Sequence, residues 1–248
     1  MFSAGKILAE IHDLLEENIV PGISTYDLDR MAEEWIRKRN SKPAFKGYSG
    51  FPGSLCTSIN HQVVHGIPSK KVILEEGDII SIDSGVVFDG YYSDAARTHF
   101  VGSVSEAAQN LCRVTEQSLW LAIEQCQPGN RLGDVGWAVE QLALSKGYGV
   151  VREYVGHGIG KHLHEKPDVP NYGPANSRMT LPKGLVIAIE PMINLGTEMV
   201  DVLDDDWTVV TRDKSLSAHY EHTIAITEEG PLVLTDSLSH PGRMTRPN

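Results

Sequence analysis

Cysteine is scarce in this sequence, and so are long apolar runs. The three cysteines, Cys56, Cys112 and Cys126, include no C-x-x-C pair. So few thiols, in an odd number, argue against a disulfide framework and favour a reducing compartment, with Cys112 and Cys126 as packing residues of a helix. No stretch approaches the ~20 apolar residues of a membrane span, and the N-terminal residues lack the cationic start and apolar run of a signal peptide. The sequence therefore predicts a cytoplasmic protein that is not inserted in a membrane.

Basic residues are in short supply as well. The chain has 22 lysines and arginines against 33 aspartates and glutamates, which gives a formal net charge of -11. Because so acidic a chain repels phosphate backbones, nucleic acid is not expected among its partners. Some of the carboxylates can instead be neutralised by bound cations, in which case the formal count overstates the negative charge.

Length and periodicity indicate one α+β domain. A chain of 248 residues that is 41% hydrophobic can bury one substantial core, although two domains remain possible on length alone. Apolar side chains recur at helical spacing, and the predicted helices span residues 4–18, 25–39, 104–126 and 131–146. The second helix begins at a capping sequence, Ser24-Thr25-Tyr26-Asp27, after a break at Pro21-Gly22.

Strands are predicted where the apolar period changes to two. Residues 78–87 alternate and are β-branched, Asp89-Gly90 is a strong hairpin turn, and residues 91–100 return as the partner strand. Further short strands are expected near residues 55–59, 150–155, 184–190, 207–212, 219–226 and 231–235. Two helices with strands, repeated once, predict two similar halves around a shared, mostly antiparallel sheet that helices cover on one face. Residues 237–248 are polar, and we expect them to form a flexible tail behind a domain of residues 1–236.

Acidic residues occupy costly positions on these predicted strands. Asp83 and Asp94 lie on the two arms of the hairpin, Glu190 ends the apolar run GLVIAIE, and Glu221 comes just before the apolar run TIAIT. A buried carboxylate is costly unless it is paired or bound to a cation, and two together raise one another's pKa unless a metal keeps both ionised. Taken singly, each of these residues is better explained as a strand residue that faces water. Together they indicate a cation site.

A glycine-rich segment around His157 adds one nitrogen ligand. The segment Gly156-His157-Gly158-Ile159-Gly160 lacks the spacing of a phosphate-binding loop or a dinucleotide fingerprint. The nearby His162-Leu163-His164-Glu165 lacks the H-E-x-x-H spacing of helical zinc proteases. Glycines beside a histidine let the backbone approach a site closely. Four carboxylates with one imidazole suit Mn, Fe(II), Co or Mg better than a sulfur-rich structural zinc site.

These motifs, in this order, resemble those of the methionine aminopeptidases of the pita-bread fold. The resemblance rests on the sequence motifs GHGIG, HE, IEPM and YEHT, and on TSIN and VVHGIP within residues 57–68. It also rests on the order of Asp83, Asp94, His157, Glu190 and Glu221 along the chain. It covers about residues 4–235, nearly the whole chain. No long insertion separates the ligands and no zinc-knuckle extension precedes them, which is similar to the type I form in its short bacterial variety.

The resemblance implies a site for two divalent metal ions, with cobalt, manganese and iron(II) as candidates. In that family the counterparts of Asp94 and Glu221 bridge both ions, those of His157 and Glu190 complete one, and that of Asp83 chelates the other. A water between the ions ionises near neutral pH and becomes the nucleophile. Glu190 is then expected to be catalytic as well, passing a proton from that water to the departing amine.

Two histidines and a pocket complete the implied site. His65 and His164 are expected to bind the scissile region of the substrate and to stabilise its tetrahedral oxyanion. The pocket for the methionine side chain is expected to contain Tyr48, Phe51, Cys56, His65 and Trp207, with His164 across the metals. Phe45 and Val64 are positions where we expect the family to vary. The implied activity is removal of the N-terminal methionine, before a small second residue, by a catalytic domain of residues 1–236.

Two competing hypotheses remain. Aminopeptidase P and prolidase share the fold and the ligands, but they usually carry a further N-terminal domain, for which a helix beginning within the first ten residues leaves no room. A non-enzymatic relative that serves as a binding module would be expected to have lost ligands, and here all five are present. For the methionine aminopeptidase, the implied partners are a peptide or nascent-chain N-terminus and a transient contact with the ribosome, and the protein is expected to be a monomer.

Overall fold

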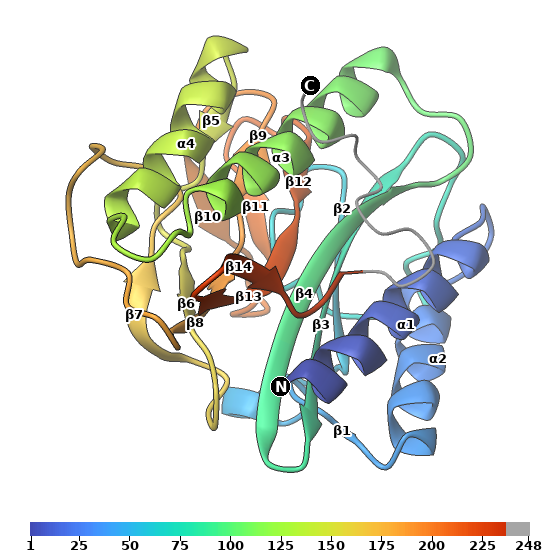
Figure 1. The fold of residues 1–248 in the computed structure, drawn as a ribbon. Coiled ribbons are helices and arrows are strands. Elements are labelled where there is room, and N and C mark those ends of the chain that lie inside the picture. Colours follow the sequence, from blue (N-terminus) through green and yellow to red (C-terminus); the bar gives the residue numbers. More distant parts are fainter. Residues whose placement is uncertain (237–248) are drawn as a thin grey trace.

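The computed structural model describes residues 1–236, and the predicted tail of residues 237–248 lies outside the described residues (Figure 1). Its helices are α1 (Phe2–Asn18), α2 (Thr25–Lys38), α3 (Glu106–Glu124) and α4 (Leu132–Ser145). All four predicted helices are confirmed, each end within two residues of the expected one. Cys112 in α3 and Cys126 just beyond it are buried, so their prediction as packing residues is also confirmed. None of these helices combines the length and the apolar character that crossing a bilayer requires.

Local chemistry explains where the helices begin. The Ser24 hydroxyl accepts a hydrogen bond from the backbone N–H of Asp27 at 3.1 Å and donates one to its carboxylate at 2.6 Å, as the capping sequence predicts. Ser105 caps α3 in the same way, through the backbone N–H of Ala108. Before α2 the chain turns at Gly22, whose φ of +95° lies in the left-handed region that favours glycine.

A nine-stranded antiparallel sheet is the centre of the fold. Its main path is β1-β3-β4-β13-β8-β6-β7, with β2 paired to β3 and β14 paired to β13. These strands are β1 (Lys42–Pro43), β2 (Leu55–Ile59), β3 (Ile79–Phe88), β4 (Tyr91–Phe100), β6 (Gly156–Gly158), β7 (Glu165–Val169), β8 (Val186–Ile189), β13 (Glu221–Thr227) and β14 (Gly230–Val233). A smaller sheet contains β5 (Gly149–Val150), β9 (Met192–Asn194) and β12 (Ser217–His219), and β10 (Val200–Val202) forms a hairpin with β11 (Val209–Thr211). Because the described pairings are antiparallel, the predicted α+β class is confirmed.

The helices cover one face of this sheet, and the two-residue period of the strands decides which side chains they bury. Helix α1, with α2 beside it, packs over β3 and β4, where Ile80 and Ile82 enter one apolar core. Helices α3 and α4 form a second core, which Ile187, Ile189 and Ile224 enter from β8 and β13. Figure 1 shows the two helix pairs over different parts of the sheet. Each helix pair therefore packs on its own strands and has its own core.

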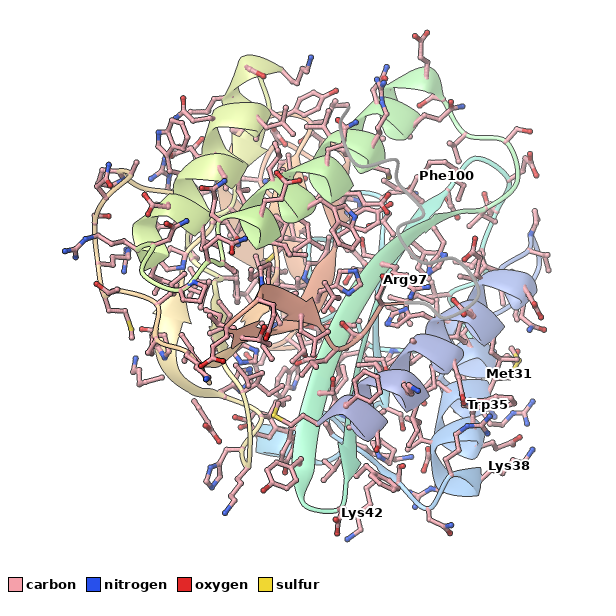
Figure 2. All side chains as sticks on the ribbon, viewed as in Figure 1. Met31, Trp35, Lys38, Lys42, Arg97 and Phe100 are labelled. Atoms are coloured by element: carbon pink, nitrogen blue, oxygen red, sulfur yellow. The ribbon has the colours of Figure 1, made fainter. Side chains whose placement is uncertain are left out.

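A polar contact also fixes α1 on this face. Arg97 of β4, labelled in Figure 2, donates a hydrogen bond of 2.9 Å to Asp13 of α1. In the same region the His12 ring of α1 donates from Nε2 to the carbonyl oxygen of Ala95 at 2.9 Å. Since the Arg97 side chain points toward the helices, the two-residue period directs Asp94 to the opposite face.

The glycine-rich strand β6 differs from the prediction. The strand predicted at residues 150–155 is wrong, because β5 has only 2 residues and the next strand is β6 itself. A Cβ at Gly156 would lie 2.3 Å from the carbonyl oxygen of Ala188, and one at Gly158 would lie 2.3 Å from that of Lys166. These glycines therefore let β6 fit between β8 and β7. Strands β1, β7, β9, β10 and β12 were also not predicted, since they carry too few alternating apolar residues.

Candidate active site

Acidic side chains from neighbouring strands meet on the face of the sheet opposite the helices. Ala96 of β4 pairs with Asp83 of β3 on one side and with Glu221 of β13 on the other. Because cross-strand partners point to the same face, Asp83 and Glu221 flank Ala96 there. Asp94 lies two residues before Ala96 on β4, so it points to that face as well.

The next two strands of the sheet extend this row. The register of β13 with β8 puts Glu190, the residue after β8, opposite Glu221. The register of β8 with β6 directs His157 to the same face. The path β3-β4-β13-β8-β6 is unbroken, so five neighbouring strands present, in order, Asp83, Asp94, Glu221, Glu190 and His157. The sheet thus gathers five side chains that are far apart in the sequence.

The cluster is compact enough to hold a cation. One ligand atom each of Asp94, His157 and Glu221 lies within 4.8 Å of the others, and His157 Nε2 is 3.6 Å from Glu190 Oε1. Three buried oxygens, Asp83 Oδ1, Asp94 Oδ1 and Glu221 Oε1, have no hydrogen-bond partner among the described residues. Since buried polar atoms are nearly always satisfied, and since the set is rich in oxygen with one nitrogen, these residues fit a divalent metal.

Burial opposes the charges of these groups in the metal-free protein. It raises the pKa of Asp83 to about 7. Burial and the neighbouring carboxylates raise the pKa values of Asp94, Glu190 and Glu221 well above their usual range. Burial lowers the pKa of His157 to about 4, so its ring is neutral at neutral pH. A set of this kind takes up protons unless cations replace them.

The ring of His157 is oriented for coordination. Its Nδ1 lies 2.9 Å from the carbonyl oxygen of Gly158, and it must carry a hydrogen to donate to that acceptor. The neutral ring then has its lone pair on Nε2. This is the atom that lies 3.6 Å from Glu190 Oε1 and 3.9 Å from Asp94 Oδ2. A hydrogen bond on the far nitrogen is the usual way in which a metal-binding histidine is held.

A cavity of about 250 Å³ opens onto the cluster, and every residue that the sequence suggested for the site lines it. Besides the five cluster residues these are Tyr48, Phe51, Cys56, His65, His164 and Trp207. The Phe51 ring packs edge-on against Trp207 with centroids 5.1 Å apart, and His65 meets Trp207 at 6.3 Å. Burial raises the pKa of the Cys56 thiol well above its usual range, so a neutral thiol faces the cavity. Phe45 and Val64 line it too.

Two histidines stand beside the cluster as neutral rings. Burial lowers the pKa of His65 to about 4 and lowers that of His164. The Tyr48 hydroxyl lies 2.7 Å from His164 Nδ1. If the phenol donates this bond, His164 Nε2 keeps its hydrogen and is available as a donor to a ligand. His65 has a φ of 61°, a left-handed conformation that is costly for such a residue and frequent at functional sites.

Known proteins share both the sequence and the fold. The model of metallopeptidase family M24 matches residues 1–228. The methionine aminopeptidase of Clostridium acetobutylicum is 54% identical over 235 residues, which are 95% of this chain and 94% of that protein. The solved structure of methionine aminopeptidase from Thermotoga maritima has a TM-score of 0.93 and 46% identity, over 95% of this chain and 94% of that one. The chain belongs to metallopeptidase family M24.

Family M24 membership confirms two of the expectations. This metallopeptidase uses divalent metal, and its α+β fold is the expected pita-bread fold. The prolidase of Pyrococcus furiosus has a related structure, with a TM-score of 0.76 and 26% identity. The matched region is 95% of this chain but only 62% of the prolidase chain. The similarity to the Thermotoga maritima enzyme is thus both closer and more complete in length.

The M24 site also includes residues that the sequence motifs did not indicate. Tyr154 and Leu163 line the cavity, and the Tyr154 ring lies 5.4 Å from that of His65. No sequence signal marks either residue. His219 approaches the cluster with Nε2 at 3.9 Å from Glu190 Oε2. Because His219 lies two residues before Glu221, the two-residue period was a signal that could have found it.

A larger cavity, of about 470 Å³, lies on the helix-covered face of this M24 fold. Residues of α1, α3, β4 and β13 line it, among them Arg97, Trp120 and His222. It includes none of the site residues predicted from the sequence. Within residues 1–236, the group of side chains spaced for a metal ion is that of Asp94, His157 and Glu221, which lies in the smaller cavity. The larger cavity is therefore not the candidate active site.

Proposed function

We propose that this M24 metallopeptidase removes the N-terminal methionine from peptides and nascent proteins, with preference for a small second residue. The observation that carries the proposal is a single cavity in which an aromatic and sulfur-lined pocket opens onto the buried carboxylate–imidazole cluster. Such soft, polarisable surroundings suit a thioether side chain. The relatives support the same substrate, since the Clostridium acetobutylicum and Thermotoga maritima proteins are methionine aminopeptidases.

Two divalent ions are proposed, held by Asp83, Asp94, His157, Glu190 and Glu221. Charge supports this number, because four ionised carboxylates balance two dications, whereas one dication would leave buried negative charge uncompensated. The strand order supports the division of ligands. Asp94 and Glu221 come from the adjacent strands β4 and β13 and would be shared by the two ions. Asp83 comes from β3 on one side of them, and Glu190 with His157 comes from β8 and β6 on the other. The donor set suits Co, Mn or Fe(II), and metal analysis of protein purified without added metal tests both number and identity.

The reaction proposed is attack of hydroxide on the scissile carbonyl. Bound divalent ions supply the chemistry of a water whose pKa is lowered to near neutrality. The Glu190 carboxylate would take a proton from the attacking water and deliver it to the departing amine. His65 and His164, neutral and on the cavity wall, donate hydrogen bonds to the carbonyl oxygen as it becomes an oxyanion. The methionine side chain enters the pocket of Phe51, Cys56 and Trp207.

The hydrogen bond between Tyr48 and His164 gives a first prediction. We expect Tyr48→Phe to lower kcat/KM for Met-Ala-Ser about fivefold, the worth of one hydrogen bond of about 1 kcal/mol, because His164 loses the contact that fixes its donor nitrogen. Tyr91→Phe is a matched control, since Tyr91 and Tyr48 are both 41% exposed and Tyr91 lies outside the cavity. Initial rates over a range of substrate concentrations measure the effect. A Tyr48→Phe enzyme with the kcat/KM of the wild type would exclude this orienting role.

Substrate choice tests the proposed function itself. We expect kcat/KM for Met-Leu-Ser to be ~10²-fold below that for Met-Ala-Ser, because a misplacement of about 1 Å at the reacting centre costs that much. We propose that the second residue lies across the cluster beside His65 and His164, which line the cavity, so that a large side chain would collide with their rings. Norleucine at the first position, nearly isosteric with methionine, is expected to be accepted with a loss of at most ~3 kcal/mol.

Leu-Ala-Ser and Ala-Pro-Ala complete the substrate set. Poor hydrolysis of Leu-Ala-Ser supports a pocket shaped for an unbranched side chain. Equal kcat/KM values for Met-Ala-Ser and Met-Leu-Ser would contradict the proposed preference for a small second residue. A preference for Ala-Pro-Ala would favour the aminopeptidase P or prolidase hypothesis. Binding of these peptides without hydrolysis would favour the hypothesis of a non-enzymatic binding module.

The cellular setting belongs to the same proposal. A substrate that is the N-terminus of a nascent chain implies action in the cytoplasm and transient contact with the ribosome. We propose that the protein works as a monomer, because the five cluster residues and the cavity all come from one chain.

A further inference from the structure

One buried histidine near the cluster has no place in the function proposed so far. His219 ends β12 and is 1% exposed, and its Nε2 has no hydrogen-bond partner within residues 1–236. Its backbone is held from both sides by Thr98, whose hydroxyl donates to the carbonyl oxygen of His219 at 2.8 Å and accepts from its N–H at 3.0 Å. These two hydrogen bonds therefore fix the backbone position from which the His219 ring extends. A buried donor that lacks an acceptor is destabilising, so the orientation of this ring calls for an explanation.

The ring nitrogen faces the carboxylate of Glu190. His219 Nε2 lies 3.9 Å from Glu190 Oε2, while the other oxygen, Oε1, lies 3.6 Å from His157 Nε2. The carboxylate thus stands between two imidazoles. His157 cannot donate to it, because the His157 hydrogen is on Nδ1, bonded to the carbonyl oxygen of Gly158. His219 is free to carry its hydrogen on Nε2, and a side-chain movement of less than about 1 Å brings it within hydrogen-bond distance.

We propose that His219 is a positioning residue for Glu190, and that in the metal-loaded enzyme its Nε2–H donates a hydrogen bond to Glu190 Oε2. This bond would hold the carboxylate in the rotamer that turns Oε1 toward His157 and the ligand cluster. The inference rests on the proposed function, because it assigns the bond to the reaction that Glu190 serves.

Three substitutions separate this role from simple packing. In His219→Gln the side-chain amide nitrogen reaches about as far as Nε2, so the donor is retained. In His219→Asn the amide nitrogen reaches only as far as Nδ1, so a donor is present at the wrong distance. His219→Leu fills the space without a donor. Melting temperature and far-UV circular dichroism establish that each variant is folded before its activity is compared.

The expected pattern is a split between kcat and KM. Loss of a residue that orients a metal ligand typically costs 10- to 100-fold, so kcat for Met-Ala-Ser is expected to fall by ~10- to 100-fold in His219→Leu and His219→Asn. KM is expected to change little, because the substrate pocket is untouched. Calorimetric titration of metal-free protein with Mn is expected to show affinity weakened by a similar ~10- to 100-fold. His219→Gln is expected to recover most of both.

Each outcome decides the matter. A folded His219→Leu enzyme with the kcat and Mn affinity of the wild type would overturn the proposal, as would a His219→Gln enzyme as impaired as His219→Leu. Wild-type protein that binds Mn but does not release methionine would refute the proposed function instead. The Mn affinities of the variants would then still show whether His219 holds Glu190.

Discussion

Removal of bound divalent metal is expected to lower methionine release by more than ~10³-fold while the helices and strands remain folded, since free water, with a pKa of 15.7, is a far weaker nucleophile source than metal-bound water near 7. The candidate ligands lie on one face of the sheet. The two main apolar cores lie between its other face and the four helices, and no ligand contributes to them. Chelated protein assayed on Met-Ala-Ser, with far-UV circular dichroism in parallel, measures both effects. Addition of Mn, Fe(II) or Co is expected to restore hydrolysis.

A matched pair of substitutions controls for side effects of the chelator. Asp94→Asn removes one charge from the cluster, and Asp204→Asn removes one from an exposed turn between β10 and β11. We expect Asp94→Asn to lose metal and activity together and Asp204→Asn to keep both. Full activity in protein that metal analysis finds free of metal would refute the metallopeptidase mechanism.

The chelated protein also has a predictable dependence on pH. The folded-state pKa of Asp83 is raised to about 7, so the folded protein binds a proton that the unfolded chain has already released. Stability from this group is complete below its ordinary pKa near 4 and is lost as pH rises through about 7. The melting temperature of the chelated protein is thus expected to fall over that interval. With metal bound the carboxylates are compensated, and the fall is expected to be smaller.

The sequence predicted the local parts of this molecule well. Each helix shows its own amphipathic period, and Ser24 marks the start of α2 through a contact only three residues long. The hairpin of β3 and β4 is equally local, because Asp89-Gly90 joins its arms directly. The five cluster residues were identified from short sequence motifs and their order. Periodicity alone could not predict the strand order β3-β4-β13-β8-β6, which brings these five separate motifs together in one row.

The features that sequence reasoning missed depend on contacts between distant segments. Gly156 and Gly158 were interpreted only as letting the backbone approach the site. They lie in strand β6, where the absence of side chains makes room for β7 and β8. Tyr154 reaches the cavity from an irregular segment after β5, where no period applies. His219 differs from these residues, because its position two residues before Glu221 is visible in the sequence and predicts that it faces the site. That its ring faces Glu190 could not be predicted, because Glu190 comes from a distant part of the chain.

Glu190→Gln is expected to lower kcat by at least ~10²-fold, the usual contribution of a general base, with KM nearly unchanged. The amide has the shape of the carboxylate and can still offer an oxygen to the metal, but it cannot accept the proton of the attacking water. The role of a base is distinct from that of a ligand. The decisive measurement is therefore kcat in protein whose metal content equals that of the wild type.

Glu190 owes this role to its place in the row of ligands, between Glu221 and His157. It follows β8 directly, so its side chain is held by the sheet on one side while the cavity opens on the other. Its oxygens face different groups, Oε1 toward His157 and Oε2 toward His219, which leaves the carboxylate with one defined orientation. Glu198→Gln, at an exposed position, makes the same chemical change outside the site and is expected to keep the wild-type kcat. A Glu190→Gln enzyme with full metal content and a near-normal kcat would assign the proton transfer to another group and leave Glu190 as a ligand alone.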